Sequence, residues 1–318
     1  MKMQSRDKII PLVVILGATA VGKTEAAIDL AEEIGGEIIS ADSRLFYKGM
    51  NVGTAKPTAR QLKRVRHHLI DVASPDDTWN LAKFSKKGAE AINEIYSRGK
   101  IPILVGGTGQ YLRAIIEGWE IPEVPPNEKL REAIEKWSSE TSVEGLHARL
   151  QCLDGEAAAS MDARNLRRIT RALEVIFTTG KKFSGQRLRK KPPYEVFQIG
   201  LKRSREEIYE RIDQRIDSMI RSGFLEEVRS LMAEGYSSEL PSFSAIGYKQ
   251  IANYLQMESS LDEAIVEIKR LTRKFVRRQG NWFKDDDPSI TWVDMNGETT
   301  ATMAKLTQEF LKNREIIL

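Results

Sequence analysis

The sequence has a single cysteine, Cys152, among its 318 residues. One cysteine excludes an internal disulfide and a zinc site built from several thiolates, and it is typical of a reducing compartment. A long apolar run is also lacking, because the stretch 9–16 is too short to cross a membrane. It has no small-residue cleavage site and leads directly into a glycine motif. We therefore expect neither a membrane span nor a signal peptide, and we predict a cytoplasmic protein.

An excess of charge of one sign is lacking as well, since the formal net charge is only +4. The overall charge therefore identifies no class of partner, and any such signal must be local. No internal repeat or low-complexity segment interrupts the chain. A hydrophobic content of 41% over 318 residues is enough to bury a core, and the length suggests two domains or one domain with an insertion.

Strand-like and helix-like segments alternate in the first third of the chain. Short apolar runs predict buried strands, and helical spacing of apolar residues predicts helices between them. These strands and helices are expected at 10–17, 37–41 and 101–107, and at 23–34 and 83–98. The alternation indicates an α/β fold with a doubly wound parallel sheet.

The pattern changes near residue 118, where a cluster of three prolines breaks the alternation. Helical periodicity without a convincing strand then continues to about residue 177. We therefore predict a helical insertion domain at 118–190. The catalytic core would comprise 1–117 and 191–318.

The chain returns to the core with a predicted strand at 195–201. Two long helices are expected after it, at about 204–233 and about 262–284. Isoleucines spaced by four residues give the first of these helices one apolar face.

A phosphate-binding motif lies between the first strand and the first helix. G-A-T-A-V-G-K-T matches G-x-x-x-x-G-K-[ST] in full. Backbone N–H groups and the helix N-terminus would face an anion, while a lysine adds positive charge and a hydroxyl can bind Mg²⁺. The predicted phosphate-binding residues are Gly17, Ala18, Thr19, Ala20, Val21, Gly22, Lys23 and Thr24. ATP, GTP and a diphosphate ester all fit this motif.

Six further stretches, in their order and spacing, resemble the tRNA dimethylallyltransferases. They are DSRLFYKGMNVGTAKP (42–57), HHLID (67–71), GGTGQY (106–111), NLRR (165–168), AIGYKQ (245–250) and TRKFVRRQGNWFK (272–284). The resemblance spans 17–284. It implies a P-loop NTPase-like core and transfer of a dimethylallyl group from dimethylallyl diphosphate to N6 of the adenine 3′ of the anticodon. Mg²⁺ is the cofactor it implies.

The sequence departs from the family pattern at several positions. Ala18 and Val21 stand where proline and serine are more usual. Leu45 and Gln110 also differ from the common residues, and these two changes would alter the adenine pocket slightly. Gly280 would lie inside the predicted last helix and weaken it by up to about 1 kcal/mol.

In the implied reaction, diphosphate is the leaving group, so the phosphate loop would bind a leaving group and not a nucleotide. Charge builds on the diphosphate oxygens as the C–O bond breaks, and fixed positive groups lower that barrier. Lys23, Mg²⁺ on Thr24 and an arginine fork would supply them. Arg211 and Arg215 share a helix face, and the resemblance favours Arg215. The alternative is a surface arginine paired with a nearby acid.

Asp42 is the candidate general base. It follows the predicted strand 37–41, at the carboxyl end of the sheet where α/β active sites gather. The resemblance assigns to this acid the removal of a proton from the adenine amine. The alternatives are that Asp42 caps a helix or holds Mg²⁺ through water.

Basic residues are concentrated in one part of the chain. Twelve lysines and arginines lie between 164 and 203, opposed only by Glu174 and Glu195. Such a block suggests a surface for a polyanion, although a charged run is often only a solvated face. Trp282 and Phe283 could stack on bases or lie in the core.

Combined with the resemblance, these features predict binding of the tRNA anticodon stem-loop. The predicted tRNA-binding residues are Asp42, Ser43, Arg44, Leu45, Thr108, Arg131, Asn165, Arg167, Arg168, Arg171, Gly247, Tyr248, Lys249, Arg277, Arg278 and Gln279. His67, His68 and Asp71 lack further ligands at zinc-like spacing, so we expect a structural role for them. The protein is expected to act as a monomer.

Three other functions remain compatible with the motifs. One is an adenylate isopentenyltransferase acting on free AMP, ADP or ATP, although a mononucleotide needs no long basic surface. Another is a small-molecule P-loop kinase, in which Asp42 would activate a hydroxyl. The third is a non-catalytic RNA-binding protein with a P-loop.

Overall fold

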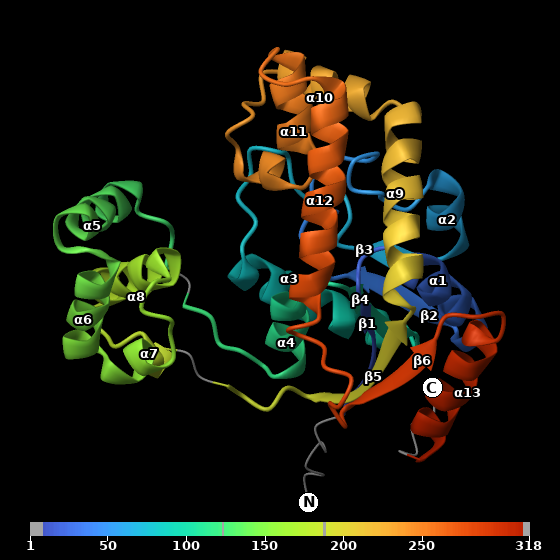
Figure 1. Ribbon diagram of the computed structural model, residues 1–318. Helices are drawn as coiled ribbons and strands as arrows, with labels where there is room; N and C mark the ends of the chain where they lie inside the picture. The colour runs from blue at the N-terminus through green and yellow to red at the C-terminus, as the bar shows by residue number, and fades with distance from the viewer. Residues whose placement is uncertain (1–8, 123, 187–188, 314–318) are drawn as a thin grey trace, which may run out of the picture. The chain divides into compact units, whose positions relative to one another are not determined.

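The computed structural model describes residues 9–122, 124–186 and 189–313, and it divides into two compact units (Figure 1). We call Met1–Ile116 with Pro193–Leu318 the core unit, and Glu117–Pro192 the insertion unit. The predicted insertion, 118–190, lies within the second unit and differs from its limits by one residue and by two.

The core unit is built on one six-stranded sheet in which every pairing is parallel. The strand order is β3-β2-β4-β1-β5-β6. The strands are β1 (Ile10–Gly17), β2 (Gly36–Ser40), β3 (His67–His68), β4 (Ile101–Gly106), β5 (Tyr194–Lys202) and β6 (Ile290–Asp294). The predicted α/β class with a parallel sheet is confirmed.

β1 lies at the centre of the sheet, and all eight of its residues are buried. Leu12, Val14 and Leu16 pack into one hydrophobic cluster, whereas Val13 and Ile15 pack into a second. Successive side chains of a strand point to opposite faces, so β1 contributes to the core on both sides of the sheet. This double burial is why the strand reads as one continuous apolar run.

Helices enclose the sheet and extend beyond its end. The core unit contains α1 (Lys23–Ile34), α2 (Ala59–Arg64), α3 (Leu81–Ser97), α4 (Gly109–Ile116), α9 (Arg205–Arg221), α10 (Phe224–Ala233), α11 (Tyr248–Leu255), α12 (Leu261–Gln279) and α13 (Thr299–Asn313). Figure 1 shows α9 rising from the end of β5, with α10, α11 and α12 beside it. These four helices share a third hydrophobic cluster around Phe224, Phe243 and Tyr248.

Two predicted helices differ from the observed ones. The helix expected at 204–233 is two helices, because Ser222 ends α9 and Gly223 takes the left-handed conformation, with φ 93°, before α10. The helix expected to reach residue 284 ends at Gln279. Gly280 is its C-cap, so the predicted weakening of a helix interior was wrong.

Several elements of the core unit were not foreseen, among them β3, β6 and α13. β3 has only two residues and β6 has five, and each is recognisable only by its place beside a longer strand. α13 packs against α1 through Met303 and Ala304 in the second cluster.

The insertion unit is helical, as its periodicity predicted. It contains α5 (Glu128–Thr141), α6 (Val143–Leu153), α7 (Gly155–Ala159) and α8 (Leu166–Thr179), around Ile134, Leu146, Leu150, Ile169 and Leu173. The segments that enter and leave the unit meet at an antiparallel bridge between Trp119 and Arg189. In neither unit does the described structure contain a helix long and apolar enough to cross a membrane.

One fully buried carboxylate, Glu174 of α8, ties the insertion unit together. It accepts hydrogen bonds from the Arg131 guanidinium at 2.9 and 3.0 Å, from Arg171 at 2.7 Å and from the Asn127 N–H at 2.7 Å. Burial raises the pKa of Glu174, but these hydrogen bonds outweigh it and hold the pKa below 4.5.

We predict that Glu174→Gln destabilises the insertion unit by about 2–3 kcal/mol, because an amide cannot satisfy two arginines. Hydrogen exchange of α8 amides measures this loss, with Glu140→Gln, an exposed site on α5, as the matched control. A lowered folded-state pKa stabilises above the unfolded value, so the difference from wild type should shrink as the pH falls below 4.5. Equal protection in both variants would contradict the assignment.

Candidate active site

The candidate site lies where neighbouring parallel strands end. The phosphate loop (Gly17–Thr24) follows β1, Asp42 follows β2, and Thr108 follows β4. These strands are adjacent in the order β2-β4-β1, so their carboxyl ends meet at one edge of the sheet. Asp42 and Thr108, which are 66 positions apart in the sequence, are thereby brought to the same edge.

The phosphate loop turns through Gly17 and Gly22, whose φ angles of 144° and 116° suit glycine. The Lys23 ammonium donates hydrogen bonds to the carbonyls of Gly17 at 3.0 Å and Ala18 at 2.7 Å. The Thr24 side chain is exposed in the first turn of α1, and its hydroxyl has no hydrogen-bond partner among the described residues. The loop therefore offers a lysine ammonium held by two carbonyls and a free hydroxyl.

Burial lowers the pKa of Lys23 from 10.5 to about 8. The Asp42 carboxylate opposes this shift, and the Arg215 guanidinium adds to it. Both groups are therefore close enough to Lys23 to influence its protonation, so the fold brings three of the predicted catalytic residues together.

Arginines that follow β5 brace the phosphate loop from its carbonyl side. The Nε of Arg203 donates to the Val21 carbonyl at 3.0 Å, and the Nε of Arg211 donates to the Ala20 carbonyl at 2.7 Å. Arg203 was counted only as part of the basic block 164–203, and its bond to the phosphate loop was not foreseen, although its place directly after a strand at the active edge is a usable signal. These bonds occupy loop carbonyls, whereas the N–H groups of Thr19 and Val21 donate to Gln279 and to the Ala18 carbonyl, so an anion would be met by the other loop N–H groups.

Arg215 lies on α9 with Arg211 but has a different hydrogen-bond partner. One of its terminal nitrogens donates to the Thr54 carbonyl at 3.4 Å. The acids that could have paired with it on the surface are engaged elsewhere, because Asp213 pairs with Arg273 and Glu207 with Arg203. The predicted alternative of a surface ion pair is therefore not what the structure contains.

Asp42 heads a turn after β2 and does not cap a helix. Its Oδ1 accepts the Arg44 N–H at 3.0 Å, and its carbonyl accepts the Leu45 N–H at 3.2 Å. Ser43 is half-buried beside it, and Arg44 reaches the Pro241 carbonyl at 3.3 Å. One carboxylate oxygen thus fixes the turn, which leaves Oδ2 for other chemistry.

Gln279 joins two loops of the site. It is only 4% exposed, its Oε1 accepts the Thr19 N–H at 2.8 Å, and its Nε2 donates to the Gly107 carbonyl at 2.9 Å. The loops after β1 and β4 are thus fixed to each other by the end of α12. Gln279 was predicted to bind tRNA, whereas in this structure its buried side chain positions these two loops.

The aromatic pair after α12 also packs inside. Phe283 is buried in the first hydrophobic cluster, and Trp282 packs on that cluster and lies against Gly109, where any side chain would collide with the indole. Phe283 is therefore a core residue, which was the alternative to stacking on bases.

The other predicted tRNA contacts divide into exposed and buried residues. Arg277 and Arg278 are exposed on α12, and Lys249 is exposed on α11 with an ion pair to Glu239. Tyr248 is fully buried and Gly247 is buried beneath Phe224. A direct contact with a large ligand therefore fits the first group and not the Tyr248 side chain.

The same division holds within the insertion unit. Arg131 and Arg171 are committed to Glu174, and the Asn165 side chain caps α8 by accepting the Arg168 N–H. Arg167 and Arg168 keep their guanidinium groups exposed.

The histidine pair of β3 is structural, as expected. The Nε2 of His68 lies 2.7 Å from Glu37, and the Nδ1 of His67 lies 2.8 Å from the Val65 carbonyl. No cluster of three or more histidine, cysteine, aspartate or glutamate side chains suited to a metal occurs in the described residues.

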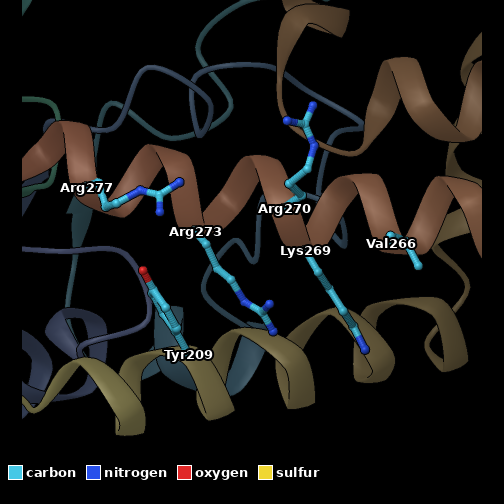
Figure 2. Close-up of a pocket in the computed structure, with 6 residues that line it drawn as sticks. All are labelled: Tyr209, Val266, Lys269, Arg270, Arg273 and Arg277. Carbon is cyan, nitrogen blue, oxygen red and sulfur yellow. The ribbon is translucent and has the colours of Figure 1, made fainter.

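A basic surface pocket lies between α9 and α12 (Figure 2). Arg273 and Lys269 point from α12 toward α9, where they pair with Asp213 at 2.6 Å and Asp217 at 2.7 Å. The Arg273 guanidinium also lies 5.4 Å from the centre of the Tyr209 ring. Most of these cations are neutralised, and they chiefly join the two helices.

Comparison with known proteins gives a consistent result. The model of the family described as IPP transferase matches residues 45–286. The chain is 46% identical over 276 residues to a tRNA dimethylallyltransferase of Roseiflexus sp. (strain RS-1), covering 87% of this chain and 90% of that protein. It is 41% identical over 301 residues to one of Dehalococcoides mccartyi, covering 95% and 93%.

Solved structures agree with the sequence relatives. A tRNA isopentenylpyrophosphate transferase of Bacillus halodurans has a TM-score of 0.72 at 36% identity and covers 96% of this chain and 98% of that one. A eukaryotic dimethylallyltransferase acting on tRNA has a TM-score of 0.80 at 26% identity, with 96% and 80% covered.

We predict that the affinity for an alkyl diphosphate falls as the pH rises above about 8, because Lys23 then loses the proton that attracts the anion. Calorimetric titration from about pH 7 to about pH 10 measures the effect, since the last ionisation of such an ester, with a pKa of about 6, is nearly complete at the start of this range. Lys23→Arg is the control, because a guanidinium stays protonated throughout and its affinity should remain flat. A wild-type affinity that is equally flat would contradict the assignment to Lys23.

Proposed function

The chain belongs to the IPP transferase family, and from this premise we propose that it transfers a dimethylallyl group to tRNA. The donor would be dimethylallyl diphosphate, the acceptor N6 of the adenine 3′ of the anticodon (tRNA position 37), and diphosphate the product. The observation that carries the proposal is the shared sheet edge of the phosphate loop and Asp42, with Arg215 near both. Family relatives named for this activity support it.

The phosphate loop would hold the diphosphate of the donor. The loop N–H groups without an internal partner and the first turn of α1 would face this anion, while Arg203 and Arg211 occupy the carbonyls of Val21 and Ala20. Lys23 would exchange its bonds to Gly17 and Ala18 for the diphosphate oxygens. Negative charge that develops on these oxygens as the C–O bond breaks would meet fixed positive groups.

Mg²⁺ fits this arrangement as a cofactor. Magnesium is usually held by one or two protein oxygens together with substrate phosphates, so a large cluster of acids is not needed. The free, exposed hydroxyl of Thr24 is the side chain that would hold it. When bound, the ion would neutralise diphosphate charge and improve the leaving group.

Asp42 would act as the general base. Its Oδ1 is used by the Arg44 N–H, and Oδ2 would accept the proton that leaves N6 as the new C–N bond forms. The target adenine must first leave the stack of the anticodon loop, which costs a few kcal/mol in single-stranded RNA. Ser43, Leu45 and Thr108, on the same edge, would border the extruded base.

The exposed cations would contact the tRNA backbone. Arg277, Arg278 and Lys249 of the core unit and Arg167 and Arg168 of the insertion unit are available for phosphates. The buried residues would support these surfaces from behind. All these roles need one copy of the chain, so we expect a monomer.

The proposal is tested by incubating the protein and Mg²⁺ with dimethylallyl diphosphate labelled in its allyl group. Unmodified tRNA and AMP are offered in separate reactions. Label in tRNA alone is expected. Label in AMP would identify a mononucleotide enzyme, and ATP turnover without tRNA would identify a kinase. Binding of tRNA without transfer would identify a non-catalytic RNA-binding protein.

We predict that Asp42→Ala and Asp42→Asn nearly abolish transfer and leave tRNA affinity within a few-fold. Asparagine keeps an oxygen for the Arg44 N–H, so this variant removes the base while preserving the turn. Single-turnover rates and filter binding are measured in parallel, with Asp262→Asn, an exposed site on α12, as control. Equal losses of binding and transfer would rule out the role as a base.

A further inference from the structure

An acidic side chain outside the phosphate loop supports one side of the site. The Glu227 carboxylate of α10 accepts the backbone N–H groups of Asn51 at 2.8 Å, Val52 at 2.7 Å and Gly53 at 3.1 Å. It also accepts the Tyr248 hydroxyl at 2.6 Å. The hydrogen bonds from these three successive N–H groups end on a charged carboxylate, and such charge-assisted bonds are stronger than bonds between neutral groups.

The bonded loop is pressed closely against α10 and α11. A side chain at Gly53 would overlap the rings of Phe224 and Tyr248. Burial, with the Glu227 carboxylate beside it, raises the pKa of Tyr248, so its hydroxyl stays protonated and donates. Packing and hydrogen bonding therefore fix the backbone of 51–53 in one position.

That position determines where the next carbonyl points. Thr54 is buried, its hydroxyl donates to the Met50 carbonyl at 2.7 Å, and its own carbonyl accepts the Arg215 guanidinium at 3.4 Å. Arg215 in turn lies near Asp42 and Lys23. A continuous set of contacts thus leads from Glu227, through 51–54, to the cation proposed to bind the leaving group.

We propose that Glu227 is a positioning residue that holds the Arg215 guanidinium in place through the 51–54 loop. It touches neither substrate, and it acts on the diphosphate side of the reaction. The proposal rests on the proposed function for the role of Arg215. Glu226, its neighbour on α10, is exposed and pairs only with Arg229 among the described residues, so it offers a matched control.

Glu227→Gln tests the proposal, because a glutamine side chain has only one acceptor oxygen for the four donors of the carboxylate. Its NH₂ group would face donors that now meet an oxygen. We expect the KM for dimethylallyl diphosphate to rise, so that its kcat/KM falls by about tenfold or more, with the KM for tRNA unchanged. Glu226→Gln should match wild type. A purely structural role would lower the fraction of folded enzyme, and hence the apparent kcat, without this selective change.

A double-mutant cycle tests the route through Arg215. In an Arg215→Lys background the contact with Thr54 is already altered, so adding Glu227→Gln should reduce kcat/KM by less than about twofold. The same loss in both backgrounds, or an unchanged Glu227→Gln enzyme, would overturn the proposal. Should Glu227→Gln fail to fold, Tyr248→Phe removes one of the four bonds, and a smaller loss on the diphosphate side alone is expected.

Binding separates this inference from the proposed function. Calorimetry with an alkyl diphosphate requires no transfer, and Glu227→Gln should weaken binding by about tenfold while Glu226→Gln does not. Transfer absent from wild type would refute the proposed function, yet weaker diphosphate binding by Glu227→Gln would still support the positioning role. Transfer by wild type with equal diphosphate binding by both variants would refute the positioning role alone.

Discussion

The parallel pairing of β1 with β4 on one side and β5 on the other is the interaction on which the candidate site depends. Parallel strands present all their carboxyl ends at one edge, so the loops after them converge. The phosphate loop, the Asp42 turn and the loop around Thr108 meet there for this reason. Because β1 is buried on both faces, its end is held rigidly, and the phosphate loop begins from a fixed point.

At this edge of the sheet, the cationic side chains of Lys23 and Arg215 lie close together although burial disfavours their charged forms. Burial lowers the pKa of Lys23 to about 8, and the nearby Arg215 adds to the shift. Asp42 offsets part of it, so the residue proposed as a base also favours the charged form of the lysine. A bound anionic diphosphate would raise the pKa of Lys23 again, so the lysine would be most fully protonated when the diphosphate is bound.

Distant parts of the chain secure the loops at this edge. Arg203 and Arg211 hold carbonyls of the phosphate loop, Gln279 fixes that loop to Gly107, and Glu227 fixes the 51–53 backbone. Several of the polar residues that resembled tRNA contacts, Gln279 and Tyr248 among them, support the site from inside. The exposed arginines remain for a polyanion.

The sequence by itself determined the α/β class, the phosphate loop, the helical insertion and the place of Asp42 after a strand. These depend on local periodicity and on spacing within short segments. Only the tertiary structure decided which polar side chains are exposed, that α9 and α10 are separate helices, and that Gln279 and Glu227 hold loops 172 and about 175 residues away in the chain. The physical reason is that burial and hydrogen-bond partners arise from contacts between remote segments, which no local pattern of residues encodes.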